Sequence, residues 1–257
     1  MKKYIIIAFI SLSATLVARA QEYKLNKNSG RLTVKLGSVT IEGYNGNEII
    51  FKSDRNEEEQ DPRAKGLRAI NGSGLQDNTG LGISVTETGG NVEVEQVSAA
   101  NEGIKIMVPK GVTISFQCHK VSNAGTVYFR NVENEIEVST DYNSIKLENI
   151  SGPATVRALY GPVDATFSDN IKGPISIASI YSTVDVAIPA STKANVELSA
   201  SHGEILAAAA LKIEMDKKPD NDMVSYSNNN VRGKLNGGGT EFKLTAEYGK
   251  IYLRTTK

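Results

Sequence analysis

The stretch Asn149-Ile-Ser-Gly-Pro-Ala-Thr-Val156 returns further along the chain as Asn170-Ile-Lys-Gly-Pro-Ile-Ser-Ile177. A second motif follows each copy, first as Tyr160-Gly-Pro-Val-Asp-Ala165 and then as Tyr181-Ser-Thr-Val-Asp-Val186. Related copies of the first motif begin at residues 131 and 191, and related copies of the second begin at 142 and 202. Successive units are therefore displaced by 18 or 21 residues. Regular spacing of similar segments is the sequence signature of a repeat architecture.

Each repeated segment predicts short strands. Apolar and polar residues alternate, as in Val163-Asp-Ala165, which is typical of a strand with one buried face and one solvated face. Gly-Pro and Tyr-Gly pairs separate these segments and supply turns. No stretch beyond residue 20 shows sustained helical periodicity. The sequence therefore predicts an all-β protein.

The spacing favours a single-stranded parallel β-helix, or β-solenoid, with coils of about 18–21 residues. Each strand would then pair in parallel with its equivalents about 4.8 Å above and below, so that inward residues form columns. We expect three such columns. One holds Ile136, Ala154, Ile175 and Val196, another holds Ile145, Val163, Val184 and Ile205, and a third holds Val132, Ile150 and Ile171, with Thr192 next. A β-sandwich also uses short alternating strands and is the alternative fold, although it does not require equal spacing.

The ends of the chain are less regular. We interpret residues 21–257 as one domain with polar insertions near 52–81 and 212–232. The first insertion contains an acidic run and a Gly/Asn-rich tract, which are typical of a solvated loop; a ligand-contacting loop is the alternative. Residues 1–20 predict a signal peptide, with a charged start, a short apolar stretch and the cleavage site Ala18-Arg-Ala20. We therefore expect export to the periplasm, the cell surface or the extracellular space.

Composition narrows the function. The chain after residue 20 holds 26 basic residues against 29 acidic ones, a net charge of about −3 that gives no reason to expect nucleic-acid binding. It has no second long apolar run, so we expect no transmembrane segment in the mature chain. Cys118 is the single cysteine, which rules out an internal disulfide framework.

An acidic pair offers the best enzymatic hypothesis. Asp164 and Asp185 occupy the same outward position in adjacent units, so their carboxylates should be neighbours. Paired acids can cleave polysaccharides, one as proton donor and the other as base or nucleophile, and their mutual repulsion would raise one pKa. Lys146 takes the equivalent position one unit earlier. We favour a solvent-facing ladder, because no further acid, Arg or His joins the pair at related offsets.

The aromatic positions form a second candidate surface. Tyr142, Tyr160, Tyr181 and His202 begin the four copies of the second motif and should line one edge. Stacked aromatics could hold a glycan ring, but such a ladder more often packs on itself and fixes the register between strands.

Other chemistry-bearing residues predict no site. Cys118 continues an inward set of apolar residues and His119 points the other way, so a buried cysteine is favoured over a nucleophile with its base. Neither Asp220-Asn-Asp222 nor the acidic run at Glu57 has the offsets of a calcium loop. The tract Gly237-Gly-Gly239 lacks the context of a phosphate loop. We therefore expect no catalytic residues, no metal and no cofactor.

The chain resembles a family of secreted, uncharacterised bacterial proteins, common in Bacteroidetes, that carry the family label "putative adhesin". The resemblance rests on Gly43-Tyr-Asn-Gly-Asn-Glu-Ile49, the segment from Lys65 to Gly82, Val108-Pro-Lys-Gly111 and the Tyr-Gly-x-Val repeats. It implies a β-helix-like fold at the cell envelope and brings no catalytic residues.

We therefore expect a non-enzymatic cell-envelope protein that binds a surface glycan or an envelope protein, or that serves as a structural module. A carbohydrate-active enzyme that uses Asp164 and Asp185 is the alternative. Terminal coils with unpaired edges also invite self-association. The charged insertion after Phe51 would cap one of these ends.

Overall fold

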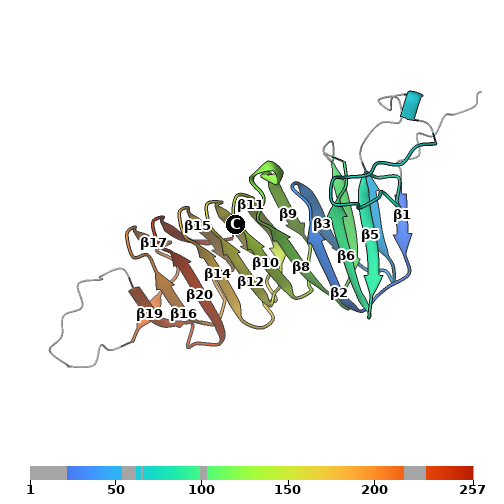
Figure 1. The fold of residues 1–257 in the computed structure, drawn as a ribbon. Coiled ribbons are helices and arrows are strands. Elements are labelled where there is room, and N and C mark those ends of the chain that lie inside the picture. The colour runs from blue at the N-terminus through green and yellow to red at the C-terminus, as the bar shows by residue number, and fades with distance from the viewer. Residues whose placement is uncertain (1–21, 54–61, 65, 99–102, 217–229, 257) are drawn as a thin grey trace, which may run out of the picture.

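The computed structural model describes residues 22–53, 62–64, 66–98, 103–216 and 230–256, so the expected signal peptide and Asp220-Asn-Asp222 lie outside the described residues. The described chain contains two large sheets and two short 3-10 turns, at Pro62–Ala64 and Val121–Asn123 (Figure 1). Sheet A has 10 strands in the spatial order β1 (Glu22–Leu25), β4 (Ile49–Ser53), β7 (Ile104–Pro109), β3 (Val39–Tyr44), β9 (Thr126–Arg130), β11 (Ser144–Ile150), β13 (Val163–Phe167), β15 (Val184–Ile188), β21 (Ile251–Thr255) and β17 (Ile205–Ala207). Sheet B has 11 strands in the order β18 (Ile213–Met215), β19 (Asn230–Leu235), β16 (Ala194–Ser199), β20 (Thr240–Ala246), β14 (Ile175–Ser179), β12 (Ala154–Ala158), β10 (Ile136–Thr140), β8 (Val112–Cys118), β2 (Gly30–Lys35), β6 (Asn91–Gln96) and β5 (Ile83–Thr88). The prediction of an all-β protein is confirmed.

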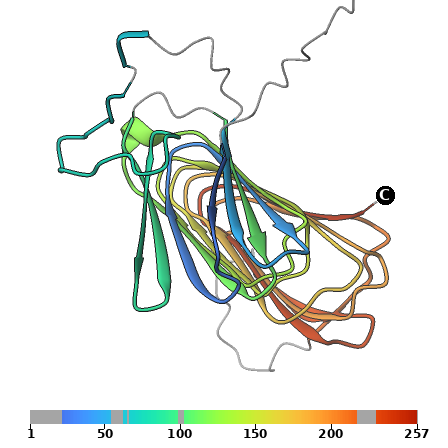
Figure 2. The same cartoon turned by 90° about the vertical axis from the view of Figure 1, so that its right-hand side faces the viewer.

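From β8 to β15 the chain alternates between the two sheets, so each strand of this stretch pairs in parallel with the strand after next. In sheet B, Ile136 lies opposite Ala154, and Ala154 lies opposite Ile175. In sheet A, Val163 is paired with Ile145 on one side and with Val184 on the other. Successive passes of the chain superpose in the view along the molecule (Figure 2). This part of the predicted column order is confirmed.

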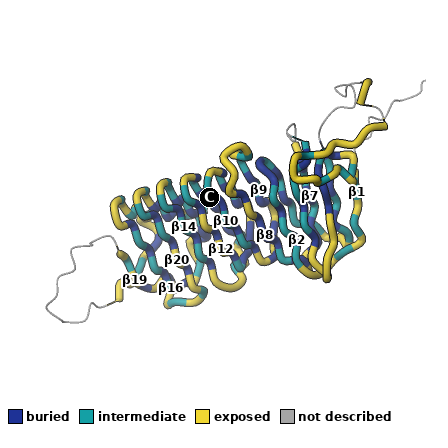
Figure 3. Tube along the Cα trace, in the orientation of Figure 1, coloured by how far each residue is buried: buried dark blue, intermediate teal, exposed yellow. Residues whose placement is uncertain are grey.

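The core lies between the sheets. Inward residues of both sheets form one apolar cluster, and the alternation of buried and exposed positions is visible along every central strand (Figure 3). The largest side chains that are fully buried include Phe51, Phe116, Phe129 and Phe242. The polar residue between two inward residues faces solvent. The alternation of apolar and polar residues in the sequence therefore matches the alternation of buried and solvent-facing side chains in the structure.

The column order predicted after Ile175 and Val184 is wrong. The strand β20 lies between β14 and β16, so Phe242 separates Ile175 from Val196. Likewise β21 lies between β15 and β17, and Ile251 separates Val184 from Ile205. The apolar content of the strands explains the order: Ile251 and Leu253 in β21 are fully buried, whereas β17 is mostly exposed. The more apolar strand takes the interior position, where it removes more surface from water.

The beginning of the chain is placed in the same way. The strand β2 lies between β6 and β8, and it pairs in parallel with both. In sheet A, β3 lies between β7 and β9. Among the parallel strands, the outermost are β6 and β16 in sheet B and β7 and β17 in sheet A. The first pair of parallel strands along the chain, β2 and β3, and the last pair, β20 and β21, each lie one position further in.

Antiparallel pairs occur at both ends of sheet B and at one end of sheet A, so both sheets are mixed. In sheet B, β5 covers β6 at one end, and β19 followed by β18 covers β16 at the other. In sheet A, β4 and then β1 continue from β7 at one end, whereas β17 is the last strand at the other. The expected polar insertion at 212–232 therefore contributes β18 and the start of β19 to sheet B. Such additions protect the edges of a parallel array from pairing with other chains.

Ion pairs connect neighbouring corners of the chain. Glu133 binds Lys110 of the preceding corner and Lys172 of a later one, with N–O distances of 2.8 Å to each. These two cations lower the pKa of Glu133 from 4.5 to about 2. Because the pKa is depressed in the folded protein, the pair stabilises the fold above the ordinary pKa and loses its effect as the pH falls towards 2.

This dependence predicts the behaviour of Glu133→Gln. The variant should be less stable than the wild type at neutral pH, and the difference should shrink on acidification and vanish near pH 2. Urea unfolding of both proteins across the acidic range measures it. High salt should also reduce the difference, since all three side chains are partly exposed. A difference that is constant with pH would contradict this role.

Candidate functional site

A row of stacked aromatic rings runs along one corner of the molecule. Tyr142, Tyr160 and Tyr181 stack in succession, with ring centroids 5.3 and 5.1 Å apart. Tyr248 follows Tyr181 at 5.2 Å, and His202 follows Tyr248 at 4.6 Å. The rings are nearly parallel, with interplanar angles of 9–17°. The structure thus brings the four predicted residues into one row. It also places Tyr248, which begins the later motif copy Tyr248-Gly-Lys-Ile251 and was not among the predicted residues, between Tyr181 and His202.

Tyr160, Tyr248 and His202 are each followed by a glycine at a point where two corners come close. A Cβ atom on Gly161 would lie 1.9 Å from the carbonyl oxygen of Asn143, in the corner below. A Cβ on Gly249 would lie at the same distance from the carbonyl oxygen of Ser182. The Tyr-Gly pair therefore allows two corners to approach each other closely while the preceding rings stack.

The stacking limits what this row can bind. A sugar packs on an aromatic residue through the face of the ring, and here the faces of the internal rings are covered by their neighbours. About half of each internal tyrosine is exposed, and that exposure belongs to the ring edges and hydroxyl groups. The geometry favours a structural role for the row, in which the rings fix the register of adjacent corners.

Substitutions along the row should separate structure from binding. Tyr181→Ser removes two stacked contacts and should lower the free energy of unfolding by about 1–3 kcal/mol, whereas Tyr142→Ser removes one and should cost about half as much. Chemical denaturation measures both. Tyr142 is the less exposed of the two, at 40% against 52%. A larger loss at Tyr142 would mean that burial, rather than stacking, determines the contribution.

The acidic pair is adjacent, as its spacing predicts. Asp164 lies opposite Asp185 on the outer face of sheet A, and Lys146 lies opposite Asp164 on the other side. Partial loss of water around its carboxylate raises the pKa of Asp164, and the charge of Asp185 acts in the same direction, while Lys146 opposes both. Arg254 was not anticipated: its Nε lies 2.7 and 3.0 Å from the two carboxylate oxygens of Asp185. This ion pair holds Asp185 on the sheet surface.

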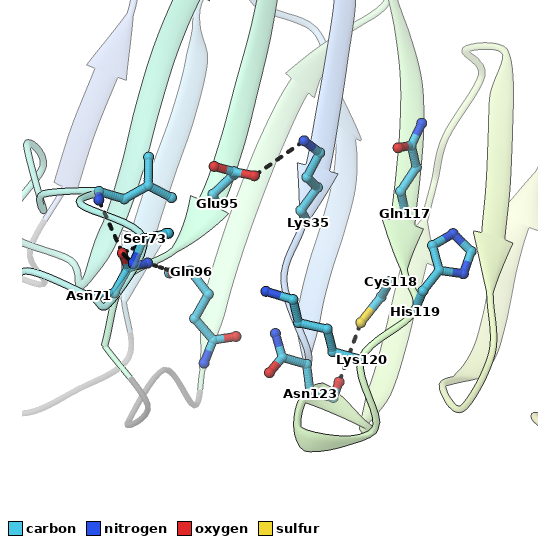
Figure 4. Close-up of a pocket in the computed structure, with 11 residues that line it drawn as sticks. Lys35, Asn71, Ser73, Glu95, Gln96, Gln117, Cys118, His119, Lys120 and Asn123 are labelled. Atoms are coloured by element: carbon cyan, nitrogen blue, oxygen red, sulfur yellow. Dashed lines mark hydrogen bonds and ion pairs between the residues drawn. The ribbon is translucent and has the colours of Figure 1, made fainter.

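A groove that the sequence did not predict lies beside the carboxyl ends of β6, β2 and β8. It has a volume of about 510 Å³, and Figure 4 shows its residues. Its polar lining includes Lys35, Gln96, Gln117, Lys120 and Asn123. Part of the first insertion, at Asn71, Ser73 and Leu75, forms one wall. No repeat motif marks this groove, because its residues come from the corners and from the insertion.

Cys118 and His119 adjoin the groove but do not form a catalytic pair. The Cys118 thiol points towards the carbonyl oxygen of Asn123, at 3.6 Å, and burial raises its pKa. The His119 ring instead contacts Asp141 through Nδ1, at 2.9 Å. A buried, protonated thiol is a poor nucleophile, so this geometry agrees with the preference for a buried cysteine.

Within the described ranges, no group of three or more His, Cys, Asp or Glu side chains is arranged to hold a metal ion. The same residues include no helix with the length and apolar character needed to cross a bilayer.

Comparisons with known proteins show similarity only at the level of solved structures. No family model matches the chain, and no curated protein matches it. A "putative cell adhesion protein" from Clostridium sporogenes has 14% identity and a TM-score of 0.42, with 93% of this chain and 100% of that chain covered. A "putative adhesin" from Bacteroides fragilis has 11% identity and a TM-score of 0.34, with 93% and 96% covered.

Proposed function

We propose that the protein is an exported β-solenoid that acts without catalysis as a rigid binding or structural module of the cell envelope. The solenoid assignment is supported by the parallel pairing of each central strand with the strand after next, from β8 to β15. Sandwiches mostly join neighbouring strands through antiparallel pairing.

One observation carries the non-catalytic part of the proposal: outward groups are engaged with each other. Arg31 holds Glu137 with both terminal nitrogens, Arg130 holds Glu148, and Arg254 holds Asp185. The stacked rings likewise cover each other. Side chains committed to neighbouring strands stiffen the array, and a stiff array presents attached loops in fixed positions.

The alternative function is carbohydrate cleavage by the acidic pair. The adjacency of Asp164 and Asp185 favours it, since glycosidic cleavage uses two neighbouring carboxyl groups, and partial burial shifts the pKa of Asp164 upwards, the direction that a proton donor requires. Against it, the Arg254 Nε holds both carboxylate oxygens of Asp185, so this carboxylate is already engaged with a neighbouring strand.

A turnover assay on acidic and neutral polysaccharides separates the two functions. The chain comprising residues 21–257 should release no new reducing ends, and Asp164→Asn and Asp185→Asn should behave like the wild type. Cleavage that both variants lose would overturn the proposal and establish the alternative. A glycan array with the same protein then tests the binding role.

A further inference from the structure

The groove near Lys120 originates in the strand order of sheet B. The strands β6, β2 and β8 are parallel neighbours, so their carboxyl ends lie side by side. The central strand β2 turns into β3 through residues 36–38 only, whereas residues 119–125 connect β8 to β9. Because the short β2–β3 corner lies beside the longer β8–β9 connection, the surface between them is recessed, and this recess is the groove. The groove therefore depends on the position of β2 between the later strands β6 and β8.

The wall contributed by the insertion is fixed in place. The Asn71 side chain donates from Nδ2 to the carbonyl oxygen of Gln96, at 3.2 Å. Its Oδ1 accepts hydrogen bonds from the backbone amides of Ser73 and Leu75, both at 3.0 Å. The Nδ2 group of Asn71 therefore connects the loop to β6, and its Oδ1 atom fixes the turn at residues 71–75. A groove whose wall is held in this way requires little ordering when a ligand binds.

The lining carries side-chain amides and Lys120, a cation that forms no ion pair among the described residues. The Gln96 amide donates to the carbonyl oxygen of Ser98 and accepts from the backbone amide of Gly37, and its second N–H group adds a donor to the lining. Lys35 forms ion pairs with both Glu93 and Glu95, so its charge is already engaged. In contrast, the Lys120 ammonium has no carboxylate within ion-pair distance among the described residues. It extends into the same gap as the amides of Gln96 and Asn123 (Figure 4). An unpaired ammonium group beside several amides favours an anion that also carries hydroxyl groups.

We propose that this groove binds an acidic sugar, with its carboxylate on Lys120 and its hydroxyl groups on the amides of Gln96 and Asn123. The Gln117 amide already donates to the Ser115 hydroxyl and points away from this gap (Figure 4). Amide side chains both donate and accept, as a row of sugar hydroxyls requires. Leu75 supplies an apolar contact for the C–H face of the ring. The volume lies within the range of roughly 300–1,000 Å³ that is usual for small-ligand sites. This inference rests on the proposed binding role and names the class of ligand.

The test is titration of residues 21–257 with trigalacturonate and with the neutral galactose trisaccharide of the same linkage. Trigalacturonate should bind at least about tenfold more tightly than the neutral sugar, because a charge-assisted hydrogen bond is lost in the latter. Lys120→Met should remove that preference, and added salt should weaken it in the wild type. Lys193→Met, which alters an exposed lysine remote from the groove, is the matched control and should bind like the wild type.

Three outcomes overturn the inference: no binding of trigalacturonate, equal binding of the neutral sugar, or unchanged binding by Lys120→Met. Circular dichroism of each variant verifies that it is folded. Product analysis of the same mixtures tests the proposed function separately. Cleavage that Asp164→Asn abolishes would overturn the non-catalytic role, whereas the affinities decide on the groove.

Discussion

Removal of residues 237–257 is expected to unfold the protein rather than to shorten it by one repeat. The truncation deletes β20 and β21, which separate β14 from β16 and β15 from β17. It removes the buried side chains Phe242, Leu244, Ile251 and Leu253. At about 1.5–3 kcal/mol for each, the loss is about 6–12 kcal/mol, comparable with the whole stability of a typical domain, about 5–15 kcal/mol.

A point substitution tests the same placement more gently. Phe242 is 2% exposed and meets Phe167 edge to face, with ring centroids 5.4 Å apart. Phe242→Ala should lower the free energy of unfolding by about 3–5 kcal/mol, as measured by chemical denaturation. Lys243→Ala, at the exposed neighbouring position, should change it by less than about 1 kcal/mol. A truncated chain that kept the unfolding midpoint of the wild type would show that β20 does not lie inside the array.

The second large effect is expected at Gly161. In Gly161→Ala, the new Cβ would meet the carbonyl oxygen of Asn143 at 1.9 Å, and neither backbone segment can move without disturbing the stacked rings on either side. We expect a loss of about 3 kcal/mol or more, at the upper end of the usual cost of overpacking. Thermal and chemical unfolding of the purified variant measure it.

Gly72→Ala is the matched control. This glycine has no heavy atom within 4 Å of an added Cβ, so the substitution meets no obstacle. It should leave the stability unchanged or raise it by about 0.4–1 kcal/mol, because alanine restricts the unfolded chain. If the two variants were equally stable, the close approach of the Tyr-Gly corners would be disproved.

The sequence predicts the repeated part of the fold well. The columns from Ile136 to Ile175 and from Ile145 to Val184 follow from spacing alone, because identical offsets place alike side chains in register. The order of the last units could not be obtained in this way. Spacing assumes that neighbours in sequence are neighbours in space, and β20 breaks that assumption by pairing between β14 and β16.

The candidate sites also fall into two groups: those built from repeat positions, which the sequence predicts, and those built from displaced or inserted segments, which it does not. The adjacency of Asp164 and Asp185 is confirmed because both belong to the repeat, whereas Arg254 reaches Asp185 from the displaced last unit. The groove residues share no motif, since Asn71 and Lys120 meet only after the insertion folds against β6. In the sequence, the groove is indicated only by the polar insertion near 52–81 and by Lys120. Polar loops and lysines are common on protein surfaces, so neither feature predicts a binding site.

The insertion of the last unit between earlier ones has a mechanical consequence. In an array whose final strand is also its outermost one, tension on the carboxyl end peels off hydrogen bonds one pair at a time. Here β21 is bonded to β15 on one side and to β17 on the other, so a pull on that end must shear two parallel interfaces together. The applied force is therefore divided between the β15–β21 and β21–β17 interfaces. Backbone hydrogen bonds of both interfaces then resist extension of a molecule that is held by its carboxyl end.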